Sequence, residues 1–220
     1  MNDIKYLILN RYKTISILTT TMGFSIILLM IRMKLTHSFF YLFLVWNLFL
    51  AIIPFAISSY LMCIPKPSKV SLIIWPGAWL LFLPNAPYII TDLLHLKISN
   101  THLLWLDILV VSSFALNGML MFYWSVLDME KLLKLFIKKS IVKHCFIFLF
   151  FFTSFGVYLG RFLRYNSWEI ISNPKYLLAD IVNITLKPMA NFEAWLFTLL
   201  FGTFLSIGFW VFKTLSTKEN

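Results

Sequence analysis

Two short segments contain the residues of this 220-residue chain that could do chemistry. The first is Pro84–His95, in which Asp92 and His95 lie three residues apart. A carboxylate beside an imidazole can orient the ring, raise its pKa, or hold a metal ion together with it. The same pair could act in acid–base catalysis, with His95 carrying the proton and Asp92 orienting the ring.

Two prolines predict that the helix carrying this pair is broken. Pro84 and Pro87 each lack an amide donor, and each ring crowds the carbonyl four residues earlier, which for Pro87 is that of Leu83. Asn85 belongs to the residue types that cap helix starts best, so it could begin a new helix. Two interpretations remain open: a kink or end of a membrane span, or a discontinuous helix at a binding site, as transporters use.

A restarted α-helix would bring Tyr88, Asp92 and His95 to one face, because they occupy positions i, i+4 and i+7. His102 and Asp107 follow in the chain and could join the same cluster. Two histidines and two aspartates at such loose spacing match no metal-binding signature. We therefore expect neither a metal ion nor another cofactor here.

The second polar segment, Gly160–Glu169, contains two arginines three residues apart. Arg161 and Arg164 would project from one face of a helix end. They could form ion pairs with acidic residues of the chain, or they could hold a phosphate or carboxylate group in the geometry that guanidinium favours. Both interpretations remain open. The acidic residues available for such pairs are Asp92, Asp107 and Glu169.

The elements that position these residues are hydrophobic enough to lie in a membrane. Of the 220 residues, 60% are hydrophobic and 13% are charged, whereas in soluble domains roughly half are apolar and about a quarter are charged. A bilayer core about 30 Å thick requires roughly 20 apolar residues in a helix. The sequence therefore predicts an all-α protein with six transmembrane helices in one domain, 1–220. The spans are 14–31, 39–62, 70–91, 103–127, 141–160 and 194–212.

The basic residues predict which way the chain faces. It has 19 Lys and Arg residues against nine Asp and Glu. With the N-terminus inside, twelve of these cations fall on the inner side and seven on the outer side, which is the asymmetry that the positive-inside rule favours. We therefore expect a multi-pass protein of the bacterial inner membrane with both termini in the cytoplasm. In the outer loop 164–192, a short interfacial helix is expected to begin after Pro174.

The net charge of +10 also bears on binding partners. Because the basic residues lie mostly between apolar stretches, we expect membrane lipids as partners, with anionic lipid at the cytoplasmic face, and no nucleic acid. A small anionic molecule could bind at the outer face. Inside the spans, Asn47, Asn117 and Tyr158 are expected to form hydrogen bonds between helices.

Both polar segments resemble parts of a known family. Residues 79–96, WLLFLPNAPYIITDLLHL, resemble the hallmark segment of an uncharacterised bacterial membrane family catalogued as domain of unknown function 1361. Residues 158–169, YLGRFLRYNSWE, are similar to its second hallmark. Length and hydropathy fit the family across nearly the whole chain. The resemblance implies that the two segments form the family's important surface, but it brings no established activity.

Three functions are compatible with these observations. The first is a protein with an outward-facing polar pocket that binds or transports a small anionic or lipid-linked ligand. The second is a membrane-embedded enzyme that acts on a lipid phosphate at the outer leaflet, with His95 and Asp92 as the catalytic candidates. The third is a structural membrane subunit. The candidate ligand-binding residues are Asn85, Tyr88, Asp92, His95, Asp107, Arg161, Arg164, Asn166, Trp168 and Glu169.

Overall fold

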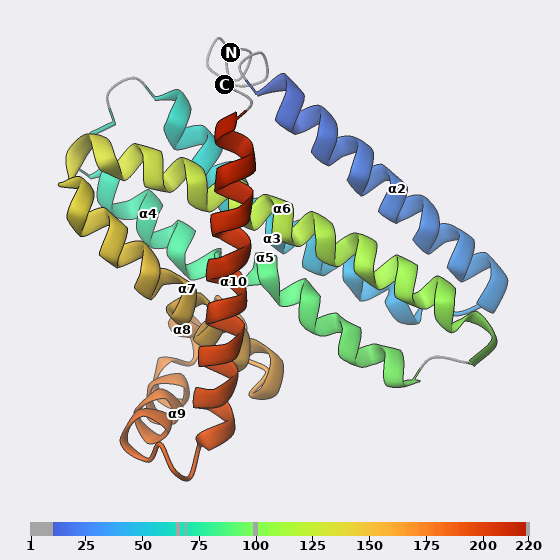
Figure 1. Ribbon diagram of the computed structural model, residues 1–220. Helices are drawn as coiled ribbons and strands as arrows, with labels where there is room; N and C mark the ends of the chain where they lie inside the picture. Colours follow the sequence, from blue (N-terminus) through green and yellow to red (C-terminus); the bar gives the residue numbers. More distant parts are fainter. Residues whose placement is uncertain (1–10, 65–66, 69, 99–100, 219–220) are drawn as a thin grey trace. The chain divides into compact units, whose positions relative to one another are not determined.

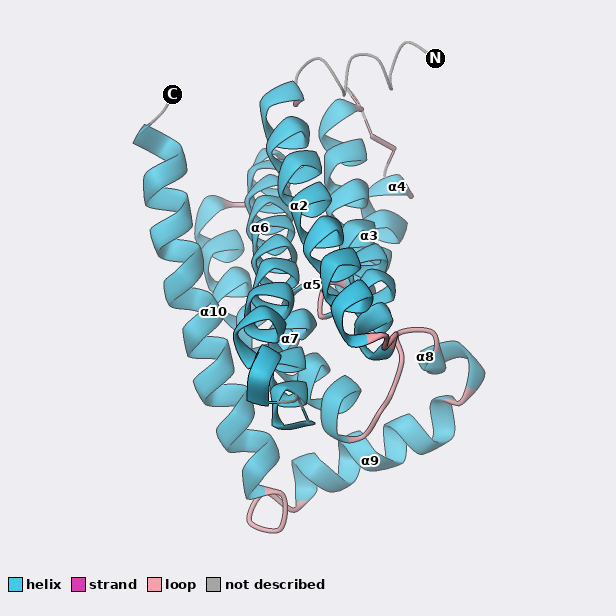
Figure 2. Ribbon diagram, turned by 90° about the vertical axis from the view of Figure 1, so that its right-hand side faces the viewer, coloured by secondary structure: helices cyan, strands magenta, loops and turns pink. Residues whose placement is uncertain are grey.

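The computed structural model describes residues 11–64, 67–68, 70–98 and 101–218. Within these ranges the chain is helical almost throughout and contains no strand, as Figure 2 shows. Three of the lysines that were counted on the inner side, Lys5, Lys66 and Lys69, lie outside the described residues.

Six helical stretches are long and apolar enough to cross a membrane. The prediction of an all-α, multi-pass membrane protein is therefore confirmed. The long helices are α2 (Tyr12–Thr36), α3 (Phe43–Cys63), α6 (Leu104–Phe136), α7 (Lys139–Phe162) and α10 (Phe192–Lys218). The third of the six stretches is made of shorter pieces: α4 (Ser71–Phe82), α5 (Asn85–Tyr88) and the 3-10 helix η2 (Ile89–Ile98).

The helices extend further than the spans expected from hydropathy. All of span 103–127 except its first residue belongs to α6, which continues to Phe136, and span 14–31 is part of α2, which continues to Thr36. Hydropathy marks only the apolar part of a helix, whereas backbone hydrogen bonding continues through charged residues at its ends.

The chain divides into two compact units, Met1–Leu132 and Leu133–Asn220, here called unit 1 and unit 2. Helix α6 runs through the division. The single domain expected from the sequence stays a prediction, and each unit is described by itself.

In unit 1, α2 and α6 lie side by side and antiparallel (Figure 1). An ion pair joins them near each end, and Asn117 joins them between these pairs. The amide of Asn117 donates to the Ser25 hydroxyl at 3.0 Å, and its oxygen accepts from the Thr21 hydroxyl at 2.7 Å. This confirms the predicted role of Asn117 between helices. The other packed helices of unit 1 are α3, α4 and α5.

In unit 2, α7 and α10 pack against each other. Between them in the chain lie α8 (Glu169–Ser172) and α9 (Pro174–Leu186). The short helix predicted after Pro174 is therefore present, with the proline as its first residue. Figure 2 shows α9 running crosswise to α10. Its apolar side chains Leu177 and Ile184 pack with Leu159 of α7 and Ala194 of α10. This cluster fixes α9 against the ends of both long helices.

The break in the third span is confirmed, but two details differ from the sequence expectation. Pro84, not Asn85, occupies the N-cap position of α5, and the Asn85 amide donates backwards to the carbonyl of Phe82 at 3.0 Å. The carbonyl of Leu83 accepts from the Ala86 amide at 3.2 Å. The chain thus replaces the hydrogen bonds lost at the prolines with tighter, three-residue turns, and no side-chain cap is needed.

Candidate functional site

The Asp92–His95 pair lies on η2 in unit 1. Asp92 is fully buried, and its Oδ2 accepts a hydrogen bond from the Asn47 amide of α3 at 2.8 Å. His95 is half-buried; its Nδ1 lies 3.7 Å from Asp92 Oδ1 and 3.3 Å from the Asp92 carbonyl oxygen. This contact depends on the 3-10 geometry, in which residues i and i+3 stand directly above one another.

The 3-10 geometry also corrects the predicted face of the segment. In an α-helix Tyr88, Asp92 and His95 would share a face, whereas the three residues per turn of η2 place His95 directly above Asp92. Tyr88 ends α5, and its carbonyl accepts from the Thr91 hydroxyl at 2.7 Å. The segment therefore places the aspartate beside the histidine as a pair, with Asn47 holding the aspartate from α3.

Asp107 has a partner that the sequence did not suggest. Arg32 of α2 donates from Nε to Asp107 Oδ1 at 2.9 Å, and both side chains are buried. Arg32 also donates to the Ser38 carbonyl at 3.1 Å, and its guanidinium lies 4.6 Å from the centre of the Tyr41 ring. Three separate contacts thus hold this arginine. In the sequence it looks like an ordinary basic residue flanking a span.

Aromatic side chains connect the Arg32–Asp107 pair to His95. The ring of Tyr41, which lies under Arg32, is 6.1 Å from that of Phe43, and the Phe43 ring is 4.8 Å from the His95 imidazole. Tyr41 itself is fully buried. Asp92 and Asp107 are therefore linked through one chain of packed side chains.

The other candidates lie in unit 2, at the end of α7. Arg161 is half-buried in the last turn of the helix. Arg164 follows the C-cap residue Leu163 and has a backbone φ of 62°, in the left-handed region, where glycine is usually found just after a helix. The amide of Tyr165 then donates to the Leu159 carbonyl at 3.1 Å, which closes the helix end. The Arg164 side chain is exposed.

Nearby carboxylates in unit 2 are engaged by neutral donors. Glu169 Oε1 accepts from the backbone amide of Asn166 at 3.2 Å and from its side-chain amide at 2.9 Å. Asp180 of α9 accepts from the Tyr165 hydroxyl at 2.7 Å. That hydrogen bond raises the pKa of Tyr165 to about 12, because losing the proton would leave two negative charges in contact.

Trp168, the remaining candidate, occupies the N-cap position of α8 and is 42% exposed. The segment from Arg161 to Glu169 is called the α7 turn below. Among the described residues Arg164 forms no hydrogen bond or ion pair, so its guanidinium is available to a ligand. The described part of the chain also contains no group of three or more His, Cys, Asp or Glu residues suited to a metal ion.

Comparison with known families identifies the chain. The sequence model described as "Protein of unknown function (DUF1361)" matches residues 46–207, which is most of the chain. The protein belongs to the DUF1361 family. Both the η2 segment and the α7 turn lie within the range that matches this family. No curated protein and no solved structure matches the chain.

Proposed function

We propose that this DUF1361 protein binds an anionic, phosphate-bearing ligand at the α7 turn. The observation that carries the proposal is Arg164, an exposed arginine held in a left-handed backbone conformation just beyond a membrane-spanning helix. For a residue other than glycine this conformation costs roughly 1–2 kcal/mol. Folding alone would favour glycine at this position, and residues held in such conformations concentrate at functional sites.

The charges around Arg164 support an anion rather than a cation. Asp180 accepts from the Tyr165 hydroxyl and Glu169 accepts from Asn166, and neither acid forms an ion pair with Arg164 among the described residues. Arg161 stands one helical turn earlier and adds a second positive charge. Planar guanidinium groups bind phosphate oxygens through paired N–H donors. The α7 turn therefore has the chemistry of a phosphate site.

The position of the turn favours a phosphate attached to a lipid. It follows a helix that is apolar enough to cross a membrane, so Arg164 lies where headgroups meet water. Nearby, α9 exposes Leu178, Val182 and Leu186, four residues apart on one face, as a helix lying along a membrane interface does. We therefore take the ligand to be a lipid or a lipid-linked phosphate.

The orientation is part of the same proposal. With both termini in the cytoplasm of a bacterial cell, the α7 turn lies at the outer leaflet of the inner membrane, and the lysines of the inner loops meet anionic lipid. In this topology the ligand is bound from the outer side, either for transport or for presentation to a partner.

The proposal is tested by native mass spectrometry of the purified full-length protein during titration with phosphatidylglycerol or with zwitterionic phosphatidylcholine. We expect preferential binding of the anionic lipid, and affinity about tenfold lower after Arg164→Ala, because hydrogen bonds to charged groups contribute about 1.5–3 kcal/mol. Arg164→Lys should lose part of this affinity, since lysine keeps the charge without the planar fork.

Lys175→Ala is the matched control, because it removes an exposed positive charge from the same unit. If it weakens binding as much as Arg164→Ala does, the site is a diffuse charge effect and the proposal fails. Displacement of the lipid by inorganic phosphate would identify the phosphate group alone as the ligand. A lipid-phosphate enzyme would also require His95 for activity, whereas a structural subunit would show no selective lipid binding at all.

A further inference from the structure

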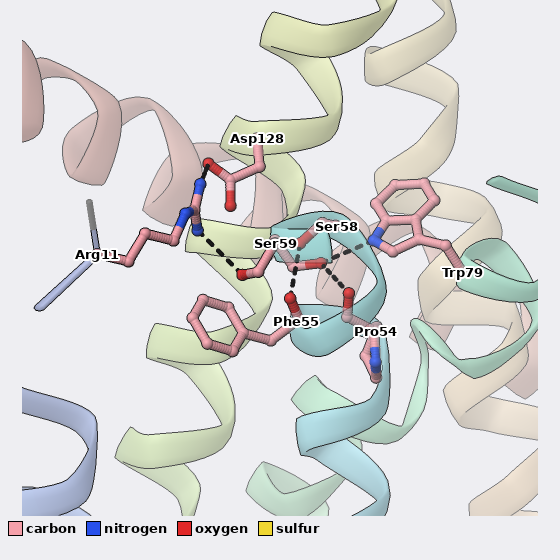
Figure 3. Close-up of polar contacts among 8 residues, drawn as sticks. Arg11, Pro54, Phe55, Ser58, Ser59, Trp79 and Asp128 are labelled. Carbon is pink, nitrogen blue, oxygen red and sulfur yellow. Dashed lines mark hydrogen bonds and ion pairs between the residues drawn. The ribbon is translucent and has the colours of Figure 1, made fainter. Parts of the chain in front are cut away.

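A third polar cluster, at the opposite end of α2 from Arg32, was not among the sequence candidates. Arg11, the N-cap residue of α2, forms an ion pair with Asp128 of α6, and it also donates to the Ser59 hydroxyl of α3 at 3.0 Å (Figure 3). Asp128 is only 5% exposed. An aspartate this deeply buried in a membrane-spanning helix marks a position where function is expected to offset its cost.

One oxygen of this carboxylate is left unsatisfied. Asp128 Oδ1 contacts Arg11, but Oδ2 is buried and has no hydrogen-bond partner among the described residues. A buried charged acceptor without a donor costs more than an ordinary unmade hydrogen bond. Thr153 is the other described residue with such a buried, unpartnered atom, but its hydroxyl is uncharged.

The neighbouring hydroxyl groups do not supply the missing donor. Ser125, one turn before Asp128 on α6, donates to the Pro54 carbonyl at 2.9 Å and accepts from the Trp79 indole at 2.7 Å. Ser58 donates to the Phe55 carbonyl at 3.0 Å, as Figure 3 shows. Both hydroxyl groups donate to backbone carbonyls, so Asp128 Oδ2 stays a buried acceptor without a donor among the described residues.

The charges around Asp128 come from two helices. Arg11 belongs to α2, whereas Lys131 and Glu130 belong to α6 itself; Lys131 is exposed and Glu130 is buried. The elements α3 and α4 contribute the Ser59 hydroxyl and the Trp79 indole. Arg11 is therefore the one positive side chain in contact with the carboxylate among the described residues.

The Arg11–Asp128 ion pair can open, because the Arg11 side chain can move away from the carboxylate towards the membrane surface. Its side chain is 15% exposed, and it occupies the N-cap position of α2, so its guanidinium can reach the membrane surface. A neutral, protonated Asp128 would then remain buried without the desolvation cost of an ion. Arg32 has no such freedom, since its side chain is 8% exposed and is held by three groups.

We propose that Asp128 is a proton-binding site, and that proton uptake releases Arg11 and frees the first turns of α2 from α3 and α6. The proton adds to Oδ2, the oxygen without a partner, and the carboxylate becomes a neutral acid. The positive charge of Arg11 moves to the headgroup region, where anionic lipid compensates it. This site belongs to unit 1 and does not depend on the proposed ligand of the α7 turn.

The chemical half of the proposal is tested by infrared difference spectroscopy of the full-length protein in nanodiscs. The pH is stepped downwards in protein carrying 13C-labelled aspartate. We expect a new isotope-shifted carbonyl band of a protonated acid, and we expect Asp128→Asn to remove it. Asp107→Asn is the matched control and should keep the band, because Asp107 is paired with the arginine that cannot leave. A wild-type protein without an acid band, or with a band that Asp128→Asn leaves unchanged, overturns the proposal.

The conformational half is tested by spin-label distances in a background with Cys63 and Cys145 replaced by alanine. Labels at the exposed positions Ser16 and Met62 report the Arg11 end of α2. We expect their distance to lengthen at low pH in the wild type, and at all pH values in Asp128→Asn. A second pair, at Leu35 and Ile108, reports the Arg32 end and should not change. If the Ser16–Met62 distance is independent of pH in the wild type, proton uptake does not release α2 and the proposal is wrong.

Discussion

At the residue scale, Gly118 marks a close approach between α6 and the broken third span. A Cβ at this position would overlap the carbonyl oxygen of Ala86 and lie 3.1 Å from the Ile89 side chain. The contacting atom is backbone, so it cannot turn aside as the end of a side chain could. The backbone at the proline break therefore packs directly against α6 at the position where the glycine leaves room for it.

We predict that Gly118→Ala destabilises the protein by about 1–3 kcal/mol, the usual cost of overpacking. Thermal unfolding in detergent measures this change. Gly23→Ala on α2 is the control, because a Cβ there meets no atom within 4 Å, and it should be neutral or slightly stabilising. Equal effects of the two substitutions would show that the Ala86 contact is unimportant.

Tyr165 provides a pH-dependent contact between the α7 turn and α9. Its pKa is raised from 10.0 to about 12 by the hydrogen bond to Asp180, so the folded state favours the neutral phenol. The stability that this contact contributes is complete below pH 10 and is lost as the pH rises through about 12. Ultraviolet titration of the phenols should show one late-titrating tyrosine fewer in Tyr165→Phe than in the wild type. An equal number in both proteins would show that the Asp180 contact does not raise the pKa of Tyr165.

Much of the residue-scale detail could not be read from the sequence. Asp92 and His95 were singled out correctly as neighbours, and Asn47 was expected to join helices, because polar residues in apolar spans need partners. Arg32 was missed, since a basic residue after a span has an ordinary explanation in membrane topology. Asp128 was missed for the same reason, as it lies near the end of a span among charged residues. Which charge pairs with which is decided by tertiary packing.

At the element scale, two ion pairs set the register of α2 against α6. Arg11 and Arg32 are 21 positions apart, and so are Asp107 and Asp128. At about 1.5 Å per residue this separation is about 32 Å, close to the thickness of the hydrocarbon core. The two pairs therefore lie near the two membrane surfaces, while the shorter polar side chains of Thr21, Ser25 and Asn117 join the helices between them.

We predict that Asp107→Asn destabilises the protein by about 3–5 kcal/mol, since it leaves Arg32 buried without its counter-charge. The exchanged double variant Arg32→Asp with Asp107→Arg should recover part of this loss, because the pair is restored in reverse. Unfolding by denaturant in detergent measures both effects. If the double variant is as unstable as the sum of its single substitutions, the two residues do not act as a pair.

The six spans and the short helix at Pro174 followed from hydropathy and proline position, because membrane thickness and backbone geometry fix them. The 3-10 conformation of η2 did not follow. An α-helix and a 3-10 helix can share the same apolar pattern over one or two turns. In the folded protein the 3-10 conformation of η2 accompanies the contact of Asp92 with Asn47 and that of His95 with Phe43. That difference decides which polar residues meet.

At the scale of the whole molecule, the proposed orientation places both termini in the cytoplasm. Single cysteines at Ile137, between α6 and α7, and at Met189, between α9 and α10, can test it. Both side chains are exposed. Each cysteine is introduced into a variant that lacks Cys63 and Cys145. In intact cells a membrane-impermeant maleimide should label residue 189, and it should label residue 137 only after the cells are lysed. The reverse pattern would place the α7 turn inside and contradict the proposed site of ligand capture.

The central claim is that Arg164 serves a ligand and not the fold, and Arg164→Gly tests it most directly. Glycine relieves the left-handed backbone at this position while it removes the guanidinium. Thermal unfolding and phosphatidylglycerol binding should be measured on the same purified variant. We predict unfolding at an unchanged or higher temperature, together with lipid binding weakened about tenfold. A variant that is less stable than the wild type, or that binds the lipid equally well, would contradict the claim.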